Sequence, residues 1–347
     1  MTITTLAIDC MGGDSGPSTM IQAACKVLTG NPDLHLILVG DEQTIRTNLS
    51  RMDQIFLTRL TVQPTSEVVL MDDIPSKALR QKPQSSMAVA IQLVADGKAQ
   101  AVVSSGNTGA LMAFSRMILK MVPGISRPAI ISSLPTDNGI SRMIDLGANV
   151  DCSPEQMVQF ALMGAAITMA NSNTTDRLPS VALLNVGSES IKGNDQTRKT
   201  HELMQNVHKI DYLGFIEGND VFNGNVDVIV CDGFVGNVLI KASEGVVQMI
   251  VRRLKQEFRR NLFTRLLAAL SISVLKSFHS SVDPDRHNGA SLVGLQGVVI
   301  KSHGAANTRA TVAAIEEAIR EANYNTPSEL QKRLGQQIAQ SMDVSDG

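Results

Sequence analysis

Short runs of β-branched and aliphatic residues alternate with helical patterns over the first two thirds of this chain. We predict strands at residues 3–9, 34–39, 60–62, 101–105, 129–134, 142–146, 181–186 and 226–231. Helix start signals lie between these runs. The clearest is Ser153-Pro154-Glu155-Gln156, which joins an N-cap serine, a proline in the first turn and a capping-box glutamine. Because strands that alternate with helices are typical of βα units, we predict an α/β protein with a mostly parallel sheet.

The composition supports a large folded body and excludes several classes of protein. Of the 347 residues, 43% are hydrophobic and 18% are charged, which is enough to bury a sizeable core and excludes general disorder. A net charge of −2 and 3% aromatic residues argue against a dedicated nucleic-acid binder, which needs a basic surface and rings for base stacking. We expect one two-lobed body over residues 1–324, followed by a C-terminal helix and tail over residues 325–347.

Neither the cysteines nor the apolar runs indicate a secreted or membrane-spanning protein. The N-terminus lacks the basic region of a signal peptide. The uncharged run Gln156–Thr175 comes closest to a membrane span, and its Ser-Pro-Glu start predicts a buried helix instead. We therefore expect a cytoplasmic protein that spans no membrane. We also expect reduced, buried thiols and no zinc site, because no Cys-x-x-Cys pair occurs among Cys10, Cys25, Cys152 and Cys231.

Five of the predicted strands end in loops that are rich in glycine, asparagine, aspartate and serine. Ligands of parallel α/β sheets collect at the carboxyl ends of the strands, where the loops lead into helices. We therefore predict that the five loops form the floor of one cleft. The candidate substrate-binding residues in these loops are Asp9, Gly12, Gly13, Asp14, Ser105, Gly106, Asn107, Thr108, Gly109, Asp145, Asn149, Asp151, Asn185, Asp232, Gly233 and Asn237.

The segment Ser104–Ala110 is the strongest candidate for an anion site. Its glycines let the backbone approach a ligand, and the helix that follows offers unpaired N–H groups and the positive end of its dipole. Ser105, Asn107 and Thr108 add hydrogen-bond donors without bulk. The segment matches neither G-x-G-x-x-G nor G-x-x-x-x-G-K-[ST], so it does not indicate a nucleotide. A capped turn without a ligand is the alternative interpretation.

A second candidate lies near the end of the chain, where Lys301-Ser302-His303-Gly304 follows an apolar run. Lys301 offers a point charge, and His303 can donate a hydrogen bond or a proton near neutral pH. The segment Asp72–Lys82 adds three cations, as either an anion-binding element or a solvated helix. No H-E-x-x-H or G-x-S-x-G motif is present, so we predict neither a metal site nor a serine nucleophile.

Residues 246–280 have a pattern of a different kind, which predicts an amphipathic basic helical arm. Apolar side chains recur every four residues from Val246 to Phe278, which drifts by about 40° per step around an α-helix. The stripe would wind nearly round one helix, so we predict two helices with a bend near Asn261. An anionic membrane, an acidic partner and a dimer interface all suit such an arm. Its candidate contact residues are Arg252, Arg253, Arg259, Arg260, Leu262, Leu266 and Leu270.

Six motifs occur in order along the chain: Asp9–Asp14 (DCMGGD), Ser105–Met112 (SGNTGALM), Leu146–Cys152 (LGANVDC), Val230–Asn237 (VCDGFVGN), Asn288–Leu292 (NGASL) and Lys301–Gly304 (KSHG). Together they resemble the PlsX family, the bacterial acyl-acyl-carrier-protein:phosphate acyltransferases, and the resemblance runs from about Thr5 to about Ala322. Many relatives carry consecutive acids where this chain has Gly187-Ser188-Glu189-Ser190, which leaves Glu189 as the candidate carboxylate there.

The resemblance implies a three-layer α/β/α fold similar to the isocitrate/isopropylmalate dehydrogenase superfamily, a homodimer and no cofactor. It implies transfer of a long-chain acyl group from acyl-acyl-carrier protein to inorganic phosphate. The acyl phosphate would pass to a membrane glycerol-3-phosphate acyltransferase for phospholipid synthesis. It also implies a cytoplasmic protein that associates peripherally with the inner face of the cell membrane.

The residues suit this chemistry. Phosphate is already an anionic nucleophile, so its attack on a thioester needs positioning and oxyanion donors more than a general base. We predict phosphate at Ser105–Gly109, with catalytic assistance from Lys301, His303, Lys192 and Asn194. A coenzyme A-dependent phosphotransacetylase and a non-catalytic membrane regulator that binds acyl chains are the alternative functions.

Overall fold

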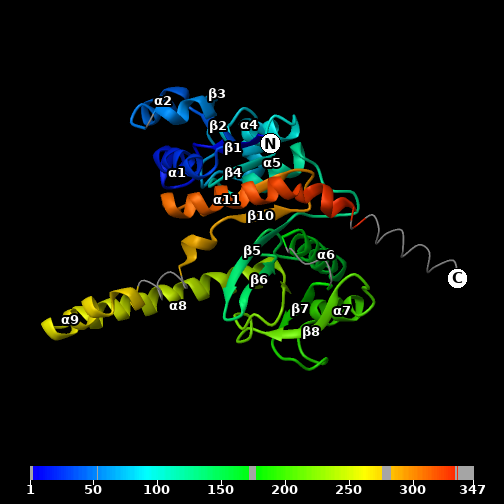
Figure 1. The fold of residues 1–347 in the computed structure, drawn as a ribbon. Helices are drawn as coiled ribbons and strands as arrows, with labels where there is room; N and C mark the ends of the chain where they lie inside the picture. Colours follow the sequence, from blue (N-terminus) through cyan, green and yellow to red (C-terminus); the bar gives the residue numbers. More distant parts are fainter. Residues whose placement is uncertain (1–2, 53, 172–176, 276–282, 333, 335–347) are drawn as a thin grey trace.

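A computed structural model describes residues 3–52, 54–171, 177–275, 283–332 and 334 of the chain. Eleven strands in these residues form a single sheet (Figure 1). The strands are β1 (Thr4–Asp9), β2 (Leu34–Gly40), β3 (Leu60–Pro64), β4 (Ala101–Ser104), β5 (Ala129–Thr136), β6 (Gly139–Ile144), β7 (Ser180–Asn185), β8 (Asp211–Glu217), β9 (Val228–Val230), β10 (Ala290–Val293) and β11 (Val298–Lys301).

The strand order is β3-β2-β1-β4-β11-β10-β5-β6-β9-β7-β8, and most neighbours run parallel. The exceptions are the pairs β11–β10, β10–β5 and β5–β6, which are antiparallel. The predicted α/β class and mostly parallel sheet are therefore confirmed. These three antiparallel pairs divide the sheet into two parallel blocks that run in opposite directions. The eight predicted strands leave out β8, β10 and β11: glycine and polar residues interrupt β8, and β10 and β11 are only four residues long.

Helices cover both faces of the sheet, as a three-layer fold requires (Figure 1). Alternate residues of β1 show how the layers form, since Leu6 and Ile8 pack in a core with one group of helices and Ala7 packs with another. The helices are α1 (Gly16–Gly30), α2 (Glu42–Leu49), α3 (Pro75–Gln81), α4 (Ser86–Ala95), α5 (Thr108–Ile118), α6 (Pro154–Asn171), α7 (Asp195–Met204), α8 (Gly233–Arg259), α9 (Leu262–Leu270) and α11 (Thr308–Tyr324), with 3₁₀ turns at Gln54–Arg59 and Pro284–His287.

Each block of the sheet is therefore buried on two sides. In the first block α1 and α11 cover the face with Leu6, and α4 and α5 cover the face with Ala7. In the second block Ile144 and Val228 pack with α6, while Met143 and Ile229 pack in a core that includes the inner part of α8. The capping box predicted at the start of α6 is present.

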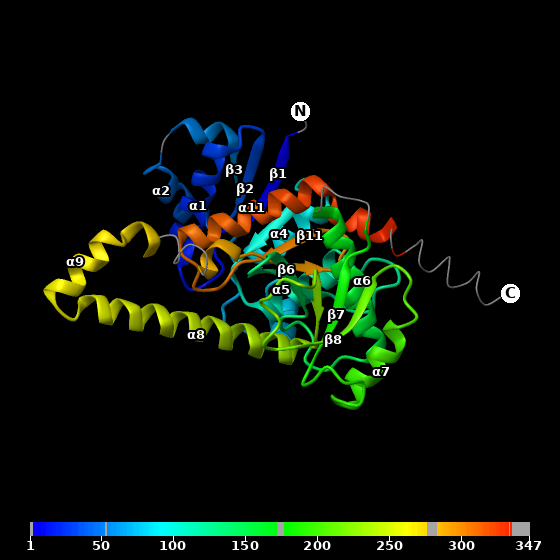
Figure 2. The ribbon, with the colours of Figure 1, turned by 60° about the horizontal axis from the view of Figure 1, so that its bottom comes forward.

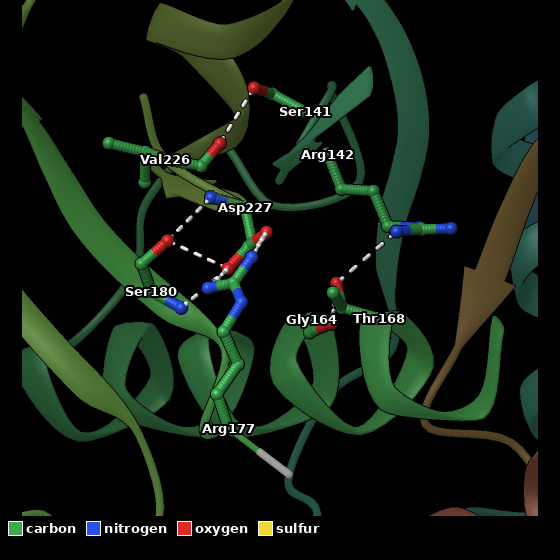
Figure 3. A network of polar contacts seen from close by, with 8 residues as sticks. All are labelled: Ser141, Arg142, Gly164, Thr168, Arg177, Ser180, Val226 and Asp227. Carbon is green, nitrogen blue, oxygen red and sulfur yellow. Dashed lines mark hydrogen bonds and ion pairs between the residues drawn. The ribbon is translucent and has the colours of Figure 1, made fainter. Parts of the chain in front are cut away.

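A polar network joins the starts of the central strands in the second block (Figure 3). Asp227 accepts two hydrogen bonds from the Arg177 guanidinium at 2.8 and 2.9 Å. The same carboxylate accepts hydrogen bonds from the Ser180 amide and hydroxyl at 2.8 and 2.7 Å. Asp227 lies just before β9 and Ser180 begins β7, so the network fixes the ends of these strands that lie opposite the candidate loops.

Helices α8 and α9 form an arm that projects from the rest of the molecule (Figure 1 and Figure 2). The predicted break near Asn261 is confirmed, because Asn261 caps α9 in a reciprocal capping box with Thr264. The arm starts earlier than predicted, since α8 begins at Gly233 inside the body. Residues 276–280 of the predicted arm and 335–347 of the predicted tail lie outside the described residues, and residues 326–332 are helical as expected.

Within the described part of the chain, α8 is the one helix with the length and hydropathy of a membrane span, and 6% of its most apolar 18-residue window is buried in the protein. The sequence instead favoured Gln156–Thr175 as the nearest match to such a span. Helix α6, which contains most of that run, packs in the core as predicted.

Candidate functional site

The carboxyl ends of β1 and β4 are joined by a buried hydrogen bond between a carboxylate and a hydroxyl. The Ser104 hydroxyl donates to Asp9 Oδ2 at 2.6 Å and accepts from the Gly106 N–H at 3.1 Å. Both side chains are almost fully buried. Burial raises the pKa of Asp9, and hydrogen bonds from Ser104 and Ser86 oppose that rise. Ser104 therefore fixes the backbone of the turn at Gly106 against β1.

The loop after β1 lies directly on this turn, and two glycines make that approach possible. A Cβ atom on Gly12 would lie 2.7 Å from the Gly106 nitrogen, closer than real Cβ atoms come to backbone. A Cβ atom on Gly13, whose φ is +84°, would lie 2.5 Å from Ser105 Oγ. Ser105 in turn donates to the Gly12 carbonyl at 2.8 Å. We call the residues Asp9–Asp14 and Ser104–Gly109 the cradle.

Lys301 brings a cation to the cradle from β11, the strand next to β4. Its Nζ donates to the Ser105 carbonyl at 3.3 Å and also to the Ser302 carbonyl. The side chain is 9% exposed. Burial lowers the pKa of Lys301 to about 8, against the attraction of Asp14 and Asp9. Lys301 therefore lies next to the Ser105 turn, as predicted.

His303 lies exposed beside Lys301 and is held by its backbone. Its N–H donates to Asn288 Oδ1 at 3.0 Å, and the Asn288 amide donates to the Ser302 hydroxyl at 2.8 Å. His303 Nδ1 lies 3.2 Å from the Ala305 N–H and accepts its hydrogen bond. A neutral imidazole in that arrangement carries its proton on Nε2. Asn288 belongs to one of the motifs found in the sequence but has no role predicted from it, and its two hydrogen bonds position this corner.

Asn107 differs from its predicted role as a free donor, because the fold already uses its amide. Its Oδ1 accepts from the Ala110 N–H at 3.0 Å, which caps α5. Its Nδ2 donates to the carbonyls of Met71 and Asp73 at 2.7 and 3.1 Å. Asn107 therefore caps α5, as the capped-turn interpretation predicts, and anion binding at this turn stays a prediction. The flanking Thr108 and Gly109 are half-buried in the first turn of α5, where the positive end of the helix dipole lies.

A second group of predicted residues gathers at the carboxyl ends of β6 and β9. Asp145 is fully buried and accepts four hydrogen bonds, from the N–H groups of Ile130, Ala148 and Asn149 and from the Asn149 amide, at 2.7 to 3.1 Å. Burial raises its pKa. The Gly233 N–H donates to the Asn149 carbonyl at 2.8 Å. These contacts make Asp145 and Asn149 the joint between the loop after β6 and the root of α8.

Other residues of this second group are partly accessible. Asp232 caps α8 by accepting from the Val235 N–H at 2.9 Å, and Asn237 is half-buried in the first turns of the same helix. A Cβ atom on Gly147 would meet the Asn237 side chain at 3.5 Å. Asp151 is exposed at the end of its loop.

The loop after β7 carries the remaining predicted residues. Asn185 donates to the carbonyls of Gly187 and Lys192, which closes the loop on itself. Asn194 caps α7 by accepting from the Thr197 N–H at 2.8 Å. Lys192 is exposed. The structure brings neither Lys192 nor Asn194 into hydrogen-bond contact with the cradle, so their catalytic assignment stays a prediction.

We predicted that the five loops line one cleft because we assumed that all of their strands run in the same direction. Strands β6, β7 and β9 run opposite to β1, β4 and β11, because β10 and the β5–β6 hairpin reverse the chain direction. Within the described residues, the hydrogen bonds and close approaches given above join the loops in separate groups. The cradle with Lys301 forms the first group, the Asp145–Gly233 joint the second, and the β7 loop the third.

The four cysteines are free thiols, as predicted, and three of them are buried. Burial raises the pKa of the Cys10 and Cys231 thiols, and it raises that of Cys152 to about 11. A thiol must ionise to act as a nucleophile, so these cysteines stay protonated near neutral pH.

Comparison with known proteins identifies relatives of this chain and of its fold. The chain is 50% identical over 334 residues to a phosphate acyltransferase of Pseudomonas savastanoi pv. phaseolicola, which covers 96% of this chain and 97% of that protein. A phosphotransacetylase structure from Streptococcus pyogenes has a TM-score of 0.60 at 16% identity, and covers 92% of this chain and 94% of that one. A 4-hydroxythreonine-4-phosphate dehydrogenase from Klebsiella pneumoniae has a TM-score of 0.55 at 14% identity, and covers 92% of this chain and 100% of that one.

The two solved structures share the fold alone at these identities, and they confirm the expected architecture. A sequence model of the family described as "Fatty acid synthesis protein" matches residues 4–329. This match and the half-identical relative agree with the motifs found in the loops. The chain therefore belongs to that fatty acid synthesis protein family, the PlsX phosphate acyltransferases, and is an acyltransferase.

Proposed function

We propose that this protein transfers a long-chain acyl group from acyl-acyl-carrier protein to inorganic phosphate and so makes acyl phosphate for phospholipid synthesis. The observation that carries the proposal is the buried Lys301 ammonium beside the Ser105 turn of the cradle. A cation and small hydrogen-bonding residues on a tight backbone suit an anion as small as phosphate. The name of the half-identical relative supports the same reaction class.

In the proposed reaction a phosphate oxygen attacks the thioester carbonyl carbon. A C–O bond forms, the C–S bond breaks, and the thiolate leaves and takes up the proton that the attacking hydrogen phosphate releases. The cradle contributes by holding phosphate near the carbonyl and by stabilising the oxyanion. His303 is the candidate for a hydrogen bond to the leaving sulfur, because its Nδ1 accepts from the Ala305 N–H and its Nε2–H is then a donor.

Direct attack without an acyl-enzyme follows from the environment of the nucleophilic side chains. Cys10 and Cys231 are buried thiols with raised pKa values. The two serines of the cradle donate to Asp9 and to the Gly12 carbonyl, which holds Ser104 and Ser105 in structural roles. Phosphate itself is the strongest nucleophile that this site would hold.

The test is incubation of the purified protein with long-chain acyl-acyl-carrier protein, with and without phosphate, followed by trapping of acyl phosphate with hydroxylamine. We expect thioester loss and hydroxamate only when phosphate is present. Parallel reactions with acyl-coenzyme A separate this function from a phosphotransacetylase. Thioester hydrolysis without phosphate, or a stable acyl adduct on a cysteine, contradicts direct attack. Acyl-chain binding without turnover would favour the non-catalytic regulator.

We further propose that the protein is a homodimer and that its arm binds an anionic membrane surface, where a membrane glycerol-3-phosphate acyltransferase would receive the product. The support is the exposure of large apolar side chains on the arm, for example 81% at Leu262 and 74% at Leu270, beside arginines 252, 253, 259 and 260. Apolar side chains and basic residues together are typical of a helix that lies in a membrane interface.

Two double variants separate the possible roles of the arm. Leu266→Glu with Leu270→Glu should abolish sedimentation with anionic vesicles and leave turnover of the carrier-protein donor unchanged. Arg259→Glu with Arg260→Glu should raise the KM for carrier protein if the arm docks that partner instead. Light scattering on both variants reports the oligomeric state, and dissociation of a dimer by the leucine changes would make the arm an interface.

A further inference from the structure

A short segment that overlaps the start of the predicted cationic element Asp72–Lys82 lies against the cradle. Residues 70–74, here called the rim segment, precede α3 and are tied to the cradle by the Asn107 amide, which donates to the carbonyls of Met71 and Asp73. The Asp73 carboxylate accepts from the Leu70 N–H at 2.8 Å and pairs with Lys82 Nζ at 2.5 Å. The rim segment is therefore fixed by polar contacts of its backbone and of Asp73.

The rim segment also touches the corner that carries His303. A Cβ atom on Gly304 would lie 3.0 Å from Met71 Cε and 3.2 Å from Asp14 Oδ2. Gly304 accepts a hydrogen bond from the Asp14 N–H at 2.8 Å, which places it in the wall of the cradle. Met71 therefore lies beside both the β1 loop and the β11 loop of the candidate site.

Three large apolar side chains of this segment are exposed to solvent. The exposed fraction is 55% for Leu70, 41% for Met71 and 53% for Ile74. Single exposed apolar residues are common on protein surfaces. Three within five residues, on a backbone held rigidly beside a polar anion site, form a local apolar edge that burial in the core does not account for.

The reaction geometry assigns an occupant to this edge. Phosphate attacks from about 3–3.5 Å, so the carbonyl carbon and the first methylenes of an acyl chain must begin within a few ångströms of the bound phosphate. We propose that Leu70, Met71 and Ile74 contact the aliphatic chain of the acyl donor and set the preference for long chains. The inference rests on the proposed transfer of an acyl group to phosphate. Each methylene that the edge removes from water should raise affinity about fourfold.

The test uses the double variant Leu70→Gln with Ile74→Gln, which keeps the backbone contacts of the segment. kcat/KM is measured with a four-carbon and a sixteen-carbon acyl group on the same carrier protein. We expect a loss of about tenfold or more for the sixteen-carbon donor and less than a twofold change for the four-carbon donor. The conservative double variant Leu70→Met with Ile74→Leu should restore long-chain turnover.

The control variant is Leu203→Gln on α7, where a leucine is 40% exposed away from the cradle contacts. It should leave both donors unchanged. An equal loss on both donors, or an unchanged sixteen-carbon rate, overturns the inference. If the wild-type protein uses neither donor, the proposed function fails instead. Should the double variant fold poorly, each single glutamine variant provides the same comparison, because both side chains are more than half exposed.

Discussion

The cradle and the arm differ in which side chains they bury and which they expose to solvent. In the cradle, the polar side chains of Asp9 and Ser104 are buried and hydrogen-bonded to each other, and the adjacent Lys301 is buried and bonded to the Ser105 carbonyl. On the arm, apolar side chains such as Leu262 and Leu270 are exposed. The fold therefore preorganises the cradle by itself, which electrostatic catalysis requires. The arm exposes apolar side chains to solvent, and a contiguous exposed apolar surface is typical of a site that binds a partner or a membrane.

Helix α8 joins the arm to the Asp145–Gly233 joint, and its two interior glycines provide the largest expected contrast between a buried root and the exposed arm. At Gly236, an alanine Cβ would overlap the Asp145 carbonyl oxygen at the root of the helix. Because that obstacle is backbone, we expect Gly236→Ala to lower the free energy of unfolding by about 3 kcal/mol or more. Urea denaturation followed by circular dichroism measures the loss, and a wild-type midpoint would show that the joint can move.

The next largest effect should be on catalysis, from Lys301. Replacing Lys301 with methionine removes the cation beside Ser105, and we expect kcat/KM for phosphate to fall by about two to three orders of magnitude. Lys98→Met is the matched control, because Lys98 pairs with Asp96 on the surface and lies outside the cradle. Wild-type activity of the Lys301→Met enzyme would show that the reaction does not require a cation beside the cradle.

The pH dependence of the wild-type enzyme tests the same cation without a mutation. Lysine is positive when protonated, and burial lowers the pKa of Lys301 to about 8. Its charge is therefore present below pH 8 and lost above it. We expect kcat/KM for phosphate to decline as the pH rises through about 8, by up to tenfold per pH unit, and this limb should be missing in Lys301→Met. A profile that stays flat to pH 9.5 would contradict the role of the charge.

A smaller effect is expected at Asn107, where the cradle meets the rim segment. Asn107→Ala removes the cap of α5 and both bonds to the rim segment, so we expect a loss of about 1–2 kcal/mol in stability together with reduced activity. Asn107→Asp keeps the capping oxygen and loses the two donors. Differential scanning calorimetry and turnover of the two variants should show recovery of stability in the aspartate variant, with long-chain activity still impaired.

Asp41→Ala is the control for that pair, since Asp41 caps α2 by accepting from the Thr44 N–H and belongs to none of the candidate sites. It should cost a similar amount of stability and leave chain-length preference unchanged. If all three variants were as stable as the wild-type protein, the capping roles would be contradicted.

The smallest effect is expected at Gly245, farther along α8. An added Cβ atom there meets nothing within 4 Å, so Gly245→Ala should stabilise the helix by about 0.5–1 kcal/mol. Urea denaturation again gives the measurement, and the sign should be opposite to that of Gly236→Ala. A destabilised Gly245→Ala protein would show that the arm packs closely against another surface in solution.

Local signals explain how much of the fold the sequence predicted. Eight of the strands, the capping box at Ser153 and the helix break at Asn261 depend on hydrophobic period and on residues a few positions apart, and all of them are present. Strands β8 and β10 were missed because neighbours in the sheet, more than their own composition, make them strands, and β11 was recognised only as an apolar run.

The α/β class, the arm and the residue types of the candidate anion site can be predicted from the amino-acid sequence, because each depends on local propensity or on a motif. How these residues are used follows from the tertiary structure alone. Ser104 reaches Asp9 across 95 residues of chain, and Lys301 reaches Ser105 across 196. The occupied amide of Asn107, the rim segment and the division of the loops follow from such long-range contacts. They depend on strand direction and packing, which no local pattern encodes.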